Sequence, residues 1–199
     1  IKSDFKNGAI AKKEYIDAMY QYHAGLFEYA DFIKDTDIAK IEIMDGEVIM
    51  TTRGSGIKMN CAKGDKRVAP IEILNFDHYE KKELDFIFKL IDKNYAVFDI
   101  GANFGWYSLN IAGCFSDCKI FAFEPIPKTF SYLKKNVALN KFSNININNF
   151  GFSDKEQEIP FYYYPEGSGN ASAANLANID SVEKINCIVK KLDNYIEEN

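Results

Sequence analysis

The stretch VFDIGANFGWYSLNIA, residues 97–112, decides the fold of this chain. It begins with a short apolar block, passes through Asp99, Gly101 and Gly105, and continues with the apolar spacing of a helix. Glycine can adopt positive φ and lets a ligand approach the backbone, and the first turn of a helix carries unpaired N–H groups. The stretch therefore predicts a strand, a tight turn and a helix, with room for an anionic or carboxylate-bearing ligand at the turn.

Helices and short apolar strands alternate on both sides of this turn. The predicted order is strand Tyr95–Ile100, helix from about Trp106, strand Lys119–Phe123, helix Lys128–Asn140 and strand Asn144–Phe150. A helix over residues 78–94 precedes them, with Asp77 as its expected N-cap. Residues 159–165 and 186–196 are further strand candidates. The alternation predicts an α/β fold with a mostly parallel sheet and helices on both of its faces.

The N-terminal part has a different pattern. Residues 9–35 have apolar side chains three or four positions apart, which predicts an amphipathic helix with the stripe Tyr15, Met19, Tyr22, Leu26, Tyr29 and Ile33. This stripe packs either on the rest of the chain or against a second copy, as in a homodimer. Ile38–Thr52 alternates about Asp45-Gly46, which predicts a β-hairpin, and 53–70 is expected to be a loop. We therefore expect an appendage over residues 1–70 and a main domain over 71–199.

Composition narrows the class of protein. A net charge of −5 gives no broad basic surface for a phosphate backbone, so nucleic acid is not the expected partner. No apolar run approaches the roughly 18 residues of a membrane span, and IKSDFKNG lacks an apolar signal core, so we expect a cytoplasmic protein. The four cysteines and two histidines show no metal-ligand spacing, which predicts reduced thiols and no metal site.

Polar residues follow three successive predicted strands. Asp99 and Glu124 stand at the ends of the first two, and Ser153 and Asp154 lie just past the third. In parallel sheets ligands bind at the carboxyl ends of the strands. An acid such as Glu124 can accept hydrogen bonds from both hydroxyls of a ribose. The three strand ends together predict a nucleoside cofactor.

The missing motifs restrict which nucleoside binds. The glycines read G-A-N-F-G rather than G-x-G-x-x-G, and no GxxxxGK[ST] occurs, so the signatures of pyrophosphate and triphosphate binding are absent. S-adenosylmethionine, a nucleoside with an amino-acid tail and no phosphate, fits better. Its carboxylate would meet the turn and its ammonium would approach Asp99. A nicotinamide-dependent dehydrogenase is the less favoured alternative.

Three segments resemble successive motifs of the FkbM family of S-adenosylmethionine-dependent methyltransferases, which are class I, Rossmann-like enzymes. They are FDIGANFGWYSLNIA, AFEPIPKTFSYLKKNVALN and NININNFGFSDKEQEIPFY, and the resemblance covers about residues 79–195. It implies a methionine-binding turn at Asp99, Gly101, Asn103 and Gly105, with a helix-start hydroxyl at Ser108. It also implies a ribose ligand at Glu124 and an adenine-side turn at Ser153 and Asp154.

The resemblance also implies O-methylation of a sugar, polyketide or other secondary metabolite, with S-adenosylhomocysteine as the product. The composition suggests a bacterial source and hence polysaccharide biosynthesis. The chain departs from the family at Ile126, where a polar residue is usual, and the family's next strand motif would follow Asn199. Catalytic residues are therefore unassigned, and a cofactor-binding scaffold without catalysis stays an alternative. His78 is a conceivable base, and residues 162–175 are a candidate acceptor-binding segment or simply an edge strand and loop.

Overall fold

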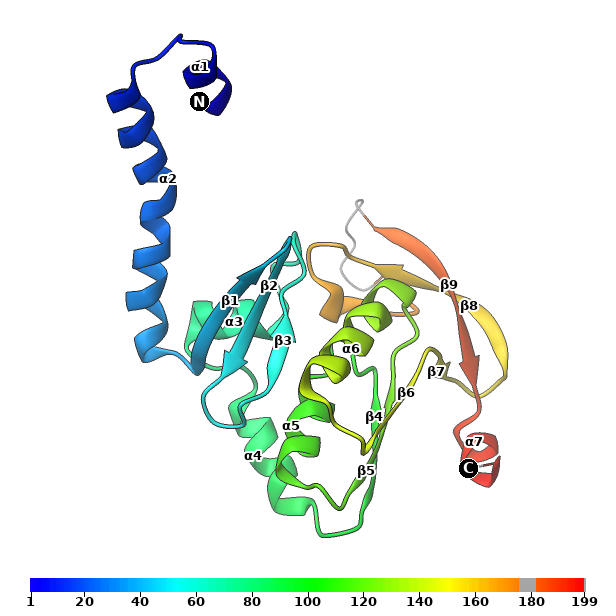
Figure 1. Ribbon diagram of the computed structural model, residues 1–199. Coiled ribbons are helices and arrows are strands. Elements are labelled where there is room, and N and C mark those ends of the chain that lie inside the picture. The colour runs from blue at the N-terminus through cyan, green and yellow to red at the C-terminus, as the bar shows by residue number, and fades with distance from the viewer. Residues whose placement is uncertain (176–181, 199) are drawn as a thin grey trace.

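The computed structural model describes residues 1–175 and 182–198. Figure 1 shows a central α/β body between an N-terminal sheet and a C-terminal sheet, with the N-terminal helical segment, residues 2–32, projecting away from it. The helices are α1 Lys2–Lys6, α2 Lys12–Phe32, α3 Ala69–Phe76, α4 Lys81–Leu90, α5 Trp106–Cys114, α6 Pro127–Asn140 and α7 Leu192–Glu198, with 3₁₀ turns η1 Ile33–Asp35 and η2 Ser168–Asn170. The strands are β1 Ile38–Met44, β2 Glu47–Thr52, β3 Lys58–Asn60, β4 Ala96–Ile100, β5 Lys119–Phe123, β6 Ile145–Asn148, β7 Gly151–Phe152, β8 Gln157–Tyr163 and β9 Glu183–Lys190.

The central sheet is parallel, as the alternation of elements predicts. β5 lies between β4 and β6, with Ala96 opposite Lys119 and Ile120 opposite Ile145. Each strand is connected to the next by a helix, α5 and then α6, because parallel neighbours need a long crossover. The carboxyl ends of β4 and β5 therefore meet at one edge of the sheet, where Asp99 and Glu124 stand.

Helices cover both faces of this sheet. On one face, Ile111 and Ala112 of α5 pack with Ile120 of β5, and side chains of α4 join the same cluster. On the opposite face, Tyr195 of α7 lies 5.1 Å from the ring of Phe123. Successive side chains of a strand point to opposite faces of the sheet, so the apolar strand β5 contributes side chains to the hydrophobic layer on each face. The expected two-sided α/β architecture is confirmed.

The N-terminal helix and hairpin also form as predicted. α2 is followed by β1 and β2, which pair antiparallel across the two-residue turn Asp45-Gly46. α1 was not predicted from the sequence. It folds back at the far end of α2, where Phe5 stacks on Tyr15 with ring centroids 4.4 Å apart. Figure 1 shows α2 standing clear of the body along most of its length.

Three local predictions are wrong. Residues 53–70 are not a continuous loop, since β3 pairs with β2 and α3 begins at Ala69. Asp77 does not cap α4: it ends α3 at φ 69°, a left-handed conformation that aspartate tolerates, and Glu80 precedes α4. The predicted strand over 186–196 ends at Lys190, because the segment after it forms α7.

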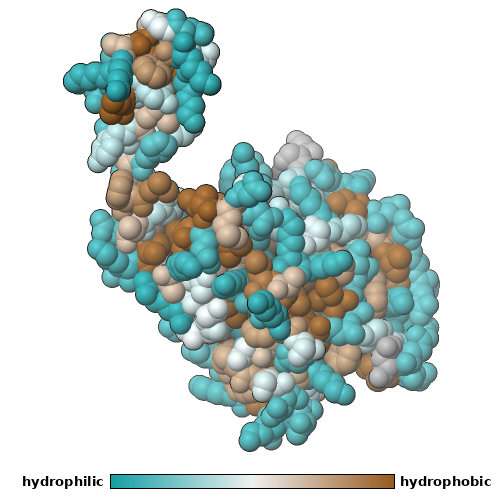
Figure 2. All heavy atoms as spheres, in the orientation of Figure 1, coloured by the Kyte–Doolittle hydropathy of each residue, from teal (hydrophilic) through white to brown (hydrophobic). Residues whose placement is uncertain are grey.

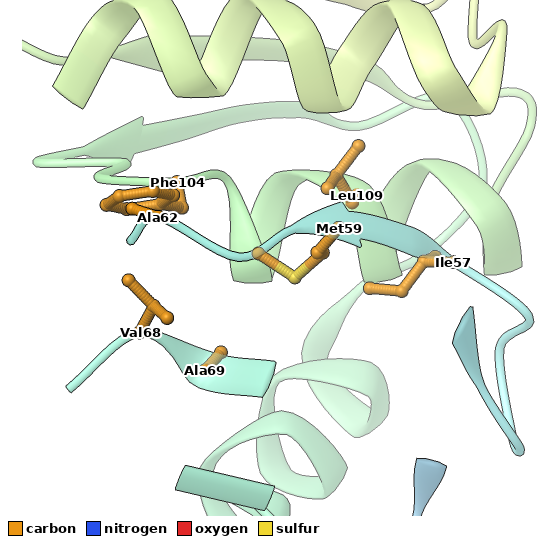
Figure 3. Close-up of a cluster of buried hydrophobic side chains, with 7 residues drawn as sticks. All are labelled: Ile57, Met59, Ala62, Val68, Ala69, Phe104 and Leu109. Atoms are coloured by element: carbon orange, nitrogen blue, oxygen red, sulfur yellow. The ribbon is translucent and has the colours of Figure 1, made fainter. Parts of the chain in front are cut away.

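β3 connects the N-terminal sheet to the central body. Asn136 of α6 is fully buried; its Oδ1 accepts a hydrogen bond from the Asn60 N–H at 2.8 Å, and its Nδ2 donates to the Phe104 carbonyl at 2.9 Å. Met59 of β3 and Leu109 of α5 belong to one buried cluster (Figure 3). The first sheet and the turn after β4 are thus held by a shared core.

In the described ranges 1–175 and 182–198, no helix combines the length and the apolar character that crossing a bilayer requires. The same residues contain no group of three histidine, cysteine, aspartate or glutamate side chains suited to holding a metal ion. Cys61, Cys114, Cys118 and Cys187 are all free thiols.

Candidate cofactor site

The turn after β4 is fixed to the end of β5 by its backbone. The N–H groups of Gly101 and Ala102 both donate to the Phe123 carbonyl at 2.9 Å. The chain then passes through Asn103 at φ 51° and Gly105 at φ 90° before α5 begins. These left-handed conformations turn the chain sharply, so the free N–H groups at the start of α5 lie beside the strand ends.

Gly105 is required by packing as well as by conformation. A Cβ atom at this position would lie 2.7 Å from Leu133 Cδ1 of α6. Leu133 is fully buried and packs with Ala102 and Ala122 in the layer between α6 and the sheet. The turn and α6 therefore approach each other as closely as a residue without a side chain allows.

Asp99 is directed at the beginning of α5. Its Oδ2 accepts hydrogen bonds from the Ser108 N–H at 3.1 Å and from the Ser108 hydroxyl at 2.6 Å. Burial raises the pKa of Asp99, while the two bonds from Ser108 act in the opposite direction. The structure thus brings Asp99 and Ser108 together, with the carboxylate close to the turn formed by Gly101 and Gly105.

Glu124 is placed on the other side of the same turn. It is only 5% exposed, and its Oε2 accepts from the Asn103 N–H at 3.0 Å while Oε1 accepts from the Ile126 N–H at 2.9 Å. A carboxylate offers about four acceptor positions, so each oxygen can take a further bond from a hydroxyl. The arrangement fits a ligand that presents two neighbouring hydroxyls, such as a ribose.

The environment of Glu124 changes its ionisation. Burial raises the pKa of Glu124 to about 7, despite the hydrogen bonds from Ile126 and Asn103 that favour the charged form; nearby Asp99 adds a smaller repulsion. The Ile126 side chain itself is fully buried beside Tyr163 and Cys187. Ile126 therefore contributes its backbone N–H to the site and no polar side chain.

Ser153 and Asp154 lie farther along the chain. The Ser153 N–H donates to the Lys190 carbonyl at 2.8 Å, which ties this turn to β9, and the Ser153 hydroxyl donates to Asp154 at 3.1 Å. In the described part of the chain, no hydrogen bond links either residue to Asp99 or Glu124. The structure thus gathers six of the eight predicted residues around one turn and leaves these two on the neighbouring sheet.

Two residues beside the turn, Asp65 and Ser168, were not predicted from the sequence. Ser168 is 3% exposed; its hydroxyl accepts from Asn103 Nδ2 at 3.4 Å, and its N–H donates to Asp65 Oδ2 at 3.2 Å. Asp65 also accepts from the Arg67 N–H at 2.9 Å. Asp65 and Ser168 are far apart in sequence and match no motif. They hold the segment containing η2 against the cofactor turn.

Replacing Asp65 by alanine should loosen this segment. The N–H groups of Arg67 and Ser168 would lose their acceptor, which we expect to lower the free energy of unfolding by about 1–2 kcal/mol and to expose residues 166–170 to protease. Thermal unfolding and limited proteolysis measure both effects. The matched control is Glu166→Gln, because its ion pair with Lys66 is solvent-exposed and should contribute less than about 1 kcal/mol. Equal behaviour of the two variants would contradict the assigned role of Asp65.

The residues predicted to act on the methyl acceptor, His78 and the tyrosines of residues 162–175, are less well placed for that role than the cofactor residues are for theirs. His78 is exposed between α3 and α4. Tyr163 and Tyr164 are buried at 3% and 7% exposure, and β8, which contains Tyr163, pairs along its length with β9. These two tyrosines therefore serve packing rather than stacking on a sugar ring. The Tyr164 hydroxyl donates to Asn175 at 2.5 Å, which fixes the base of the following loop.

The parallel α/β sheet, with a glycine turn after its first strand and an acid at the end of its second, is of the Rossmann-like kind that class I S-adenosylmethionine-dependent methyltransferases share with other nucleoside-binding proteins. Residues 63–156 match the model of the TRM5/TYW2 methyltransferase domain. The match covers slightly less than half of the chain, and over these residues the chain is similar to a methyltransferase domain.

Two sequence relatives and one solved structure illustrate the similarity. The chain is 31% identical over 103 residues to Methyltransferase 1 of Beauveria bassiana (46% of this chain, 41% of the relative) and 32% identical over 111 residues to Methyltransferase sdnD of Sordaria araneosa (50% and 43%). P. horikoshii TYW2 in complex with MeSAdo is 25% identical, with a TM-score of 0.41 over 55% of this chain and 38% of that one. The chain spans less than half the length of each of these proteins.

Proposed function

We propose that the chain binds S-adenosylmethionine at the turn after β4 and transfers its methyl group to a hydroxyl of a small molecule. Asp99, Gly101, Asn103, Gly105 and Ser108 would hold the methionine part, Glu124 the ribose, and Ser153 and Asp154 the adenine side. We also propose that residues 71–199 carry this site and that residues 1–70 form the appendage. A cytoplasmic location is part of the same proposal.

The observation that carries the proposal is the position of Glu124. Its two carboxylate oxygens are each held by one backbone N–H, at 3.0 and 2.9 Å, and remain beside the turn that Asp99 and Ser108 brace. Two parallel acceptors at a strand end are suited to the vicinal hydroxyls of a nucleoside. The turn contains no pyrophosphate signature, which favours an amino-acid tail over a second phosphate.

When bound, S-adenosylmethionine supplies an electrophilic methyl group on a sulfonium. The task of the protein is then to hold the acceptor oxygen in line with that methyl group. The methyl group would exchange its bond to sulfur for a bond to the acceptor oxygen, and the proton of that oxygen would pass to a base or to water. Asp99 would position the ammonium of the methionine part. The base is unassigned among the described residues.

A small-molecule acceptor is favoured by charge. The net charge of −5 provides little attraction for a nucleic-acid backbone, and the motif resemblance to the FkbM family supports a sugar, polysaccharide precursor or secondary metabolite. The match to the TRM5/TYW2 domain, a name given to tRNA methyltransferases, favours a second candidate, methylation of transfer RNA. A catalytically inactive cofactor-binding module is the alternative to both.

Cofactor binding should depend on pH through Glu124. Its pKa of about 7 means that the carboxyl group is protonated at pH 6 and loses one acceptor position. We expect affinity for S-adenosylhomocysteine to rise about tenfold from pH 6 to pH 8, since one proton is released. Titration calorimetry at both pH values measures this. In Glu124→Gln the rise should be largely absent, and an unchanged rise in that variant would assign the pH dependence to another group.

The acceptor class can be tested with methyl-labelled S-adenosylmethionine. The chain is incubated separately with a panel of glycans, nucleotide sugars and hydroxylated secondary metabolites and with bulk transfer RNA, and label is traced into each acceptor. Transfer to a small molecule supports the proposal, and transfer to RNA alone would overturn it in favour of the second candidate. Cofactor binding without transfer to either would favour the inactive module.

A further inference from the structure

An apolar groove lies between α2, the β1–β2 hairpin and residues 61–66. Its volume is about 1180 Å³, and none of the eight predicted cofactor residues lines it. One wall consists of Tyr22, Leu26 and Tyr29 of α2, and the other includes Ile41, Ile43 and Val48 of the hairpin. Figure 2 shows hydrophobic residues gathered where the C-terminal end of α2 meets the hairpin.

The α2 wall is the same stripe that the sequence predicts to be covered. In the isolated chain Tyr22 is 79% exposed, Leu26 55% and Tyr29 51%. Ile43 of the facing hairpin is 66% exposed. Contiguous exposed apolar surface of this kind is typical of an interaction site in proteins that fold on their own. A helix of this length also gains most of its stability from packing of its apolar face.

We propose that the groove is filled by α2 of a second copy, with the two helices antiparallel about a two-fold axis. In this arrangement each α2 lies between the α2 and the hairpin of its partner, so both copies use the same surface. The stripe recurs at alternating spacings of three and four, which is the seam of a helix pair. Each copy thus covers the apolar wall that the other leaves exposed.

Charge favours the antiparallel orientation. Residues 12–21 of α2 carry two lysines and two acidic residues and so have no net charge, whereas residues 22–32 carry the acidic Glu28 and Asp31. Antiparallel packing sets the acidic half of one helix beside the uncharged half of the other, whereas parallel packing would align the two acidic halves. Gly25 also lines the groove and has no atom within 4 Å of the position a Cβ would take. A glycine within a helix is otherwise unfavourable, and here it lets a second helix approach closely.

The available area is consistent with a stable dimer. Tyr22, Leu26, Tyr29 and Ile43 line the groove and are each at least half exposed. At roughly 100 Å² apiece they would bury about 800 Å² over two copies, and the residues around them bring the total toward the roughly 1,200–2,000 Å² of specific interfaces. The proposal thus requires no surface beyond the groove and its rim.

Sedimentation analysis of the intact chain at micromolar concentration tests the proposal. We expect a dimer, and we expect Leu26→Asp to weaken dimerisation by at least about 100-fold because it buries an unpaired charge. The matched control is Phe27→Asp: Phe27 is 66% exposed on the same helix and does not line the groove, so this variant should stay dimeric.

Circular dichroism of both variants checks that α2 remains folded. A monomeric wild-type chain would overturn the proposal, and so would equal weakening by the two substitutions. A monomer that binds a detergent or fatty acid in the groove would likewise overturn it, in favour of an apolar ligand. None of these outcomes depends on methyl transfer, so failure here is distinct from failure of the proposed function.

Discussion

Replacing Glu124 by alanine should weaken binding of S-adenosylhomocysteine by at least about 100-fold, because two hydrogen bonds to a charged group are lost, each contributing about 1.5–3 kcal/mol. The substitution also affects the protein itself, in addition to removing hydrogen bonds to the ligand. Glu124 also accepts hydrogen bonds from the backbone N–H groups of Asn103 and Ile126. The substitution removes both bonds, so the turn that would hold the methionine part is no longer fixed to the end of β5 by this side chain. Titration calorimetry of the variant and the wild-type chain at pH 8 measures the change.

Two further variants separate recognition from folding. Glu124→Gln keeps the size of the side chain and one acceptor oxygen, so its affinity should lie between those of the wild-type and alanine proteins. Asp85→Ala removes an exposed carboxylate on α4 and should bind normally. Wild-type affinity in Glu124→Ala, with an unchanged melting temperature, would contradict the role of Glu124.

Replacing Gly105 by alanine should destabilise the fold by about 2–5 kcal/mol. The left-handed φ of 90° costs an L-residue about 1–2 kcal/mol, and the new Cβ would lie 2.7 Å from Leu133 Cδ1, an overlap that typically costs about 1–3 kcal/mol. Leu133 is fully buried, so its terminal methyl group can move aside only by repacking against Ala102 and Ala122 in the layer between α6 and the sheet. Urea unfolding followed by circular dichroism measures the difference.

Gly101→Ala is the matched control for this prediction. Gly101 has nearly the same φ, 82°, but nothing lies within 4 Å of its Cβ position. It should therefore show only the conformational cost of about 1–2 kcal/mol. If the two variants lose equal stability, the close approach between the turn and α6 contributes nothing measurable.

The parallel sheet and the turn after β4 could be predicted because their signals are local. The apolar run before Asp99, the two glycines and the helical spacing after them all fall within one short stretch. Chain order then places Glu124 beside Asp99, since strands joined by helical crossovers are neighbours and end at the same edge.

The remaining contacts of the site depend on tertiary structure. Asp65 and Ser168 meet across 103 positions of sequence and are both flanked by ordinary loop residues. β3 is three residues long, too short for its alternation to be distinguished from a loop, and it is defined by pairing with β2 and packing on α6. Tyr163 likewise gives no sequence signal of its burial, which follows from its packing beside Ile126.

The central claim is that the turn after β4 and Glu124 together bind the nucleoside of S-adenosylmethionine. A crystal structure of the chain grown with S-adenosylhomocysteine tests it most directly. We predict both ribose hydroxyls within hydrogen-bond distance of the Glu124 carboxylate, at about 2.5–3.0 Å, with the amino-acid end at Gly101–Gly105. A ligand bound with its ribose away from Glu124, or no ligand at this turn at saturating concentration, would contradict the assignment.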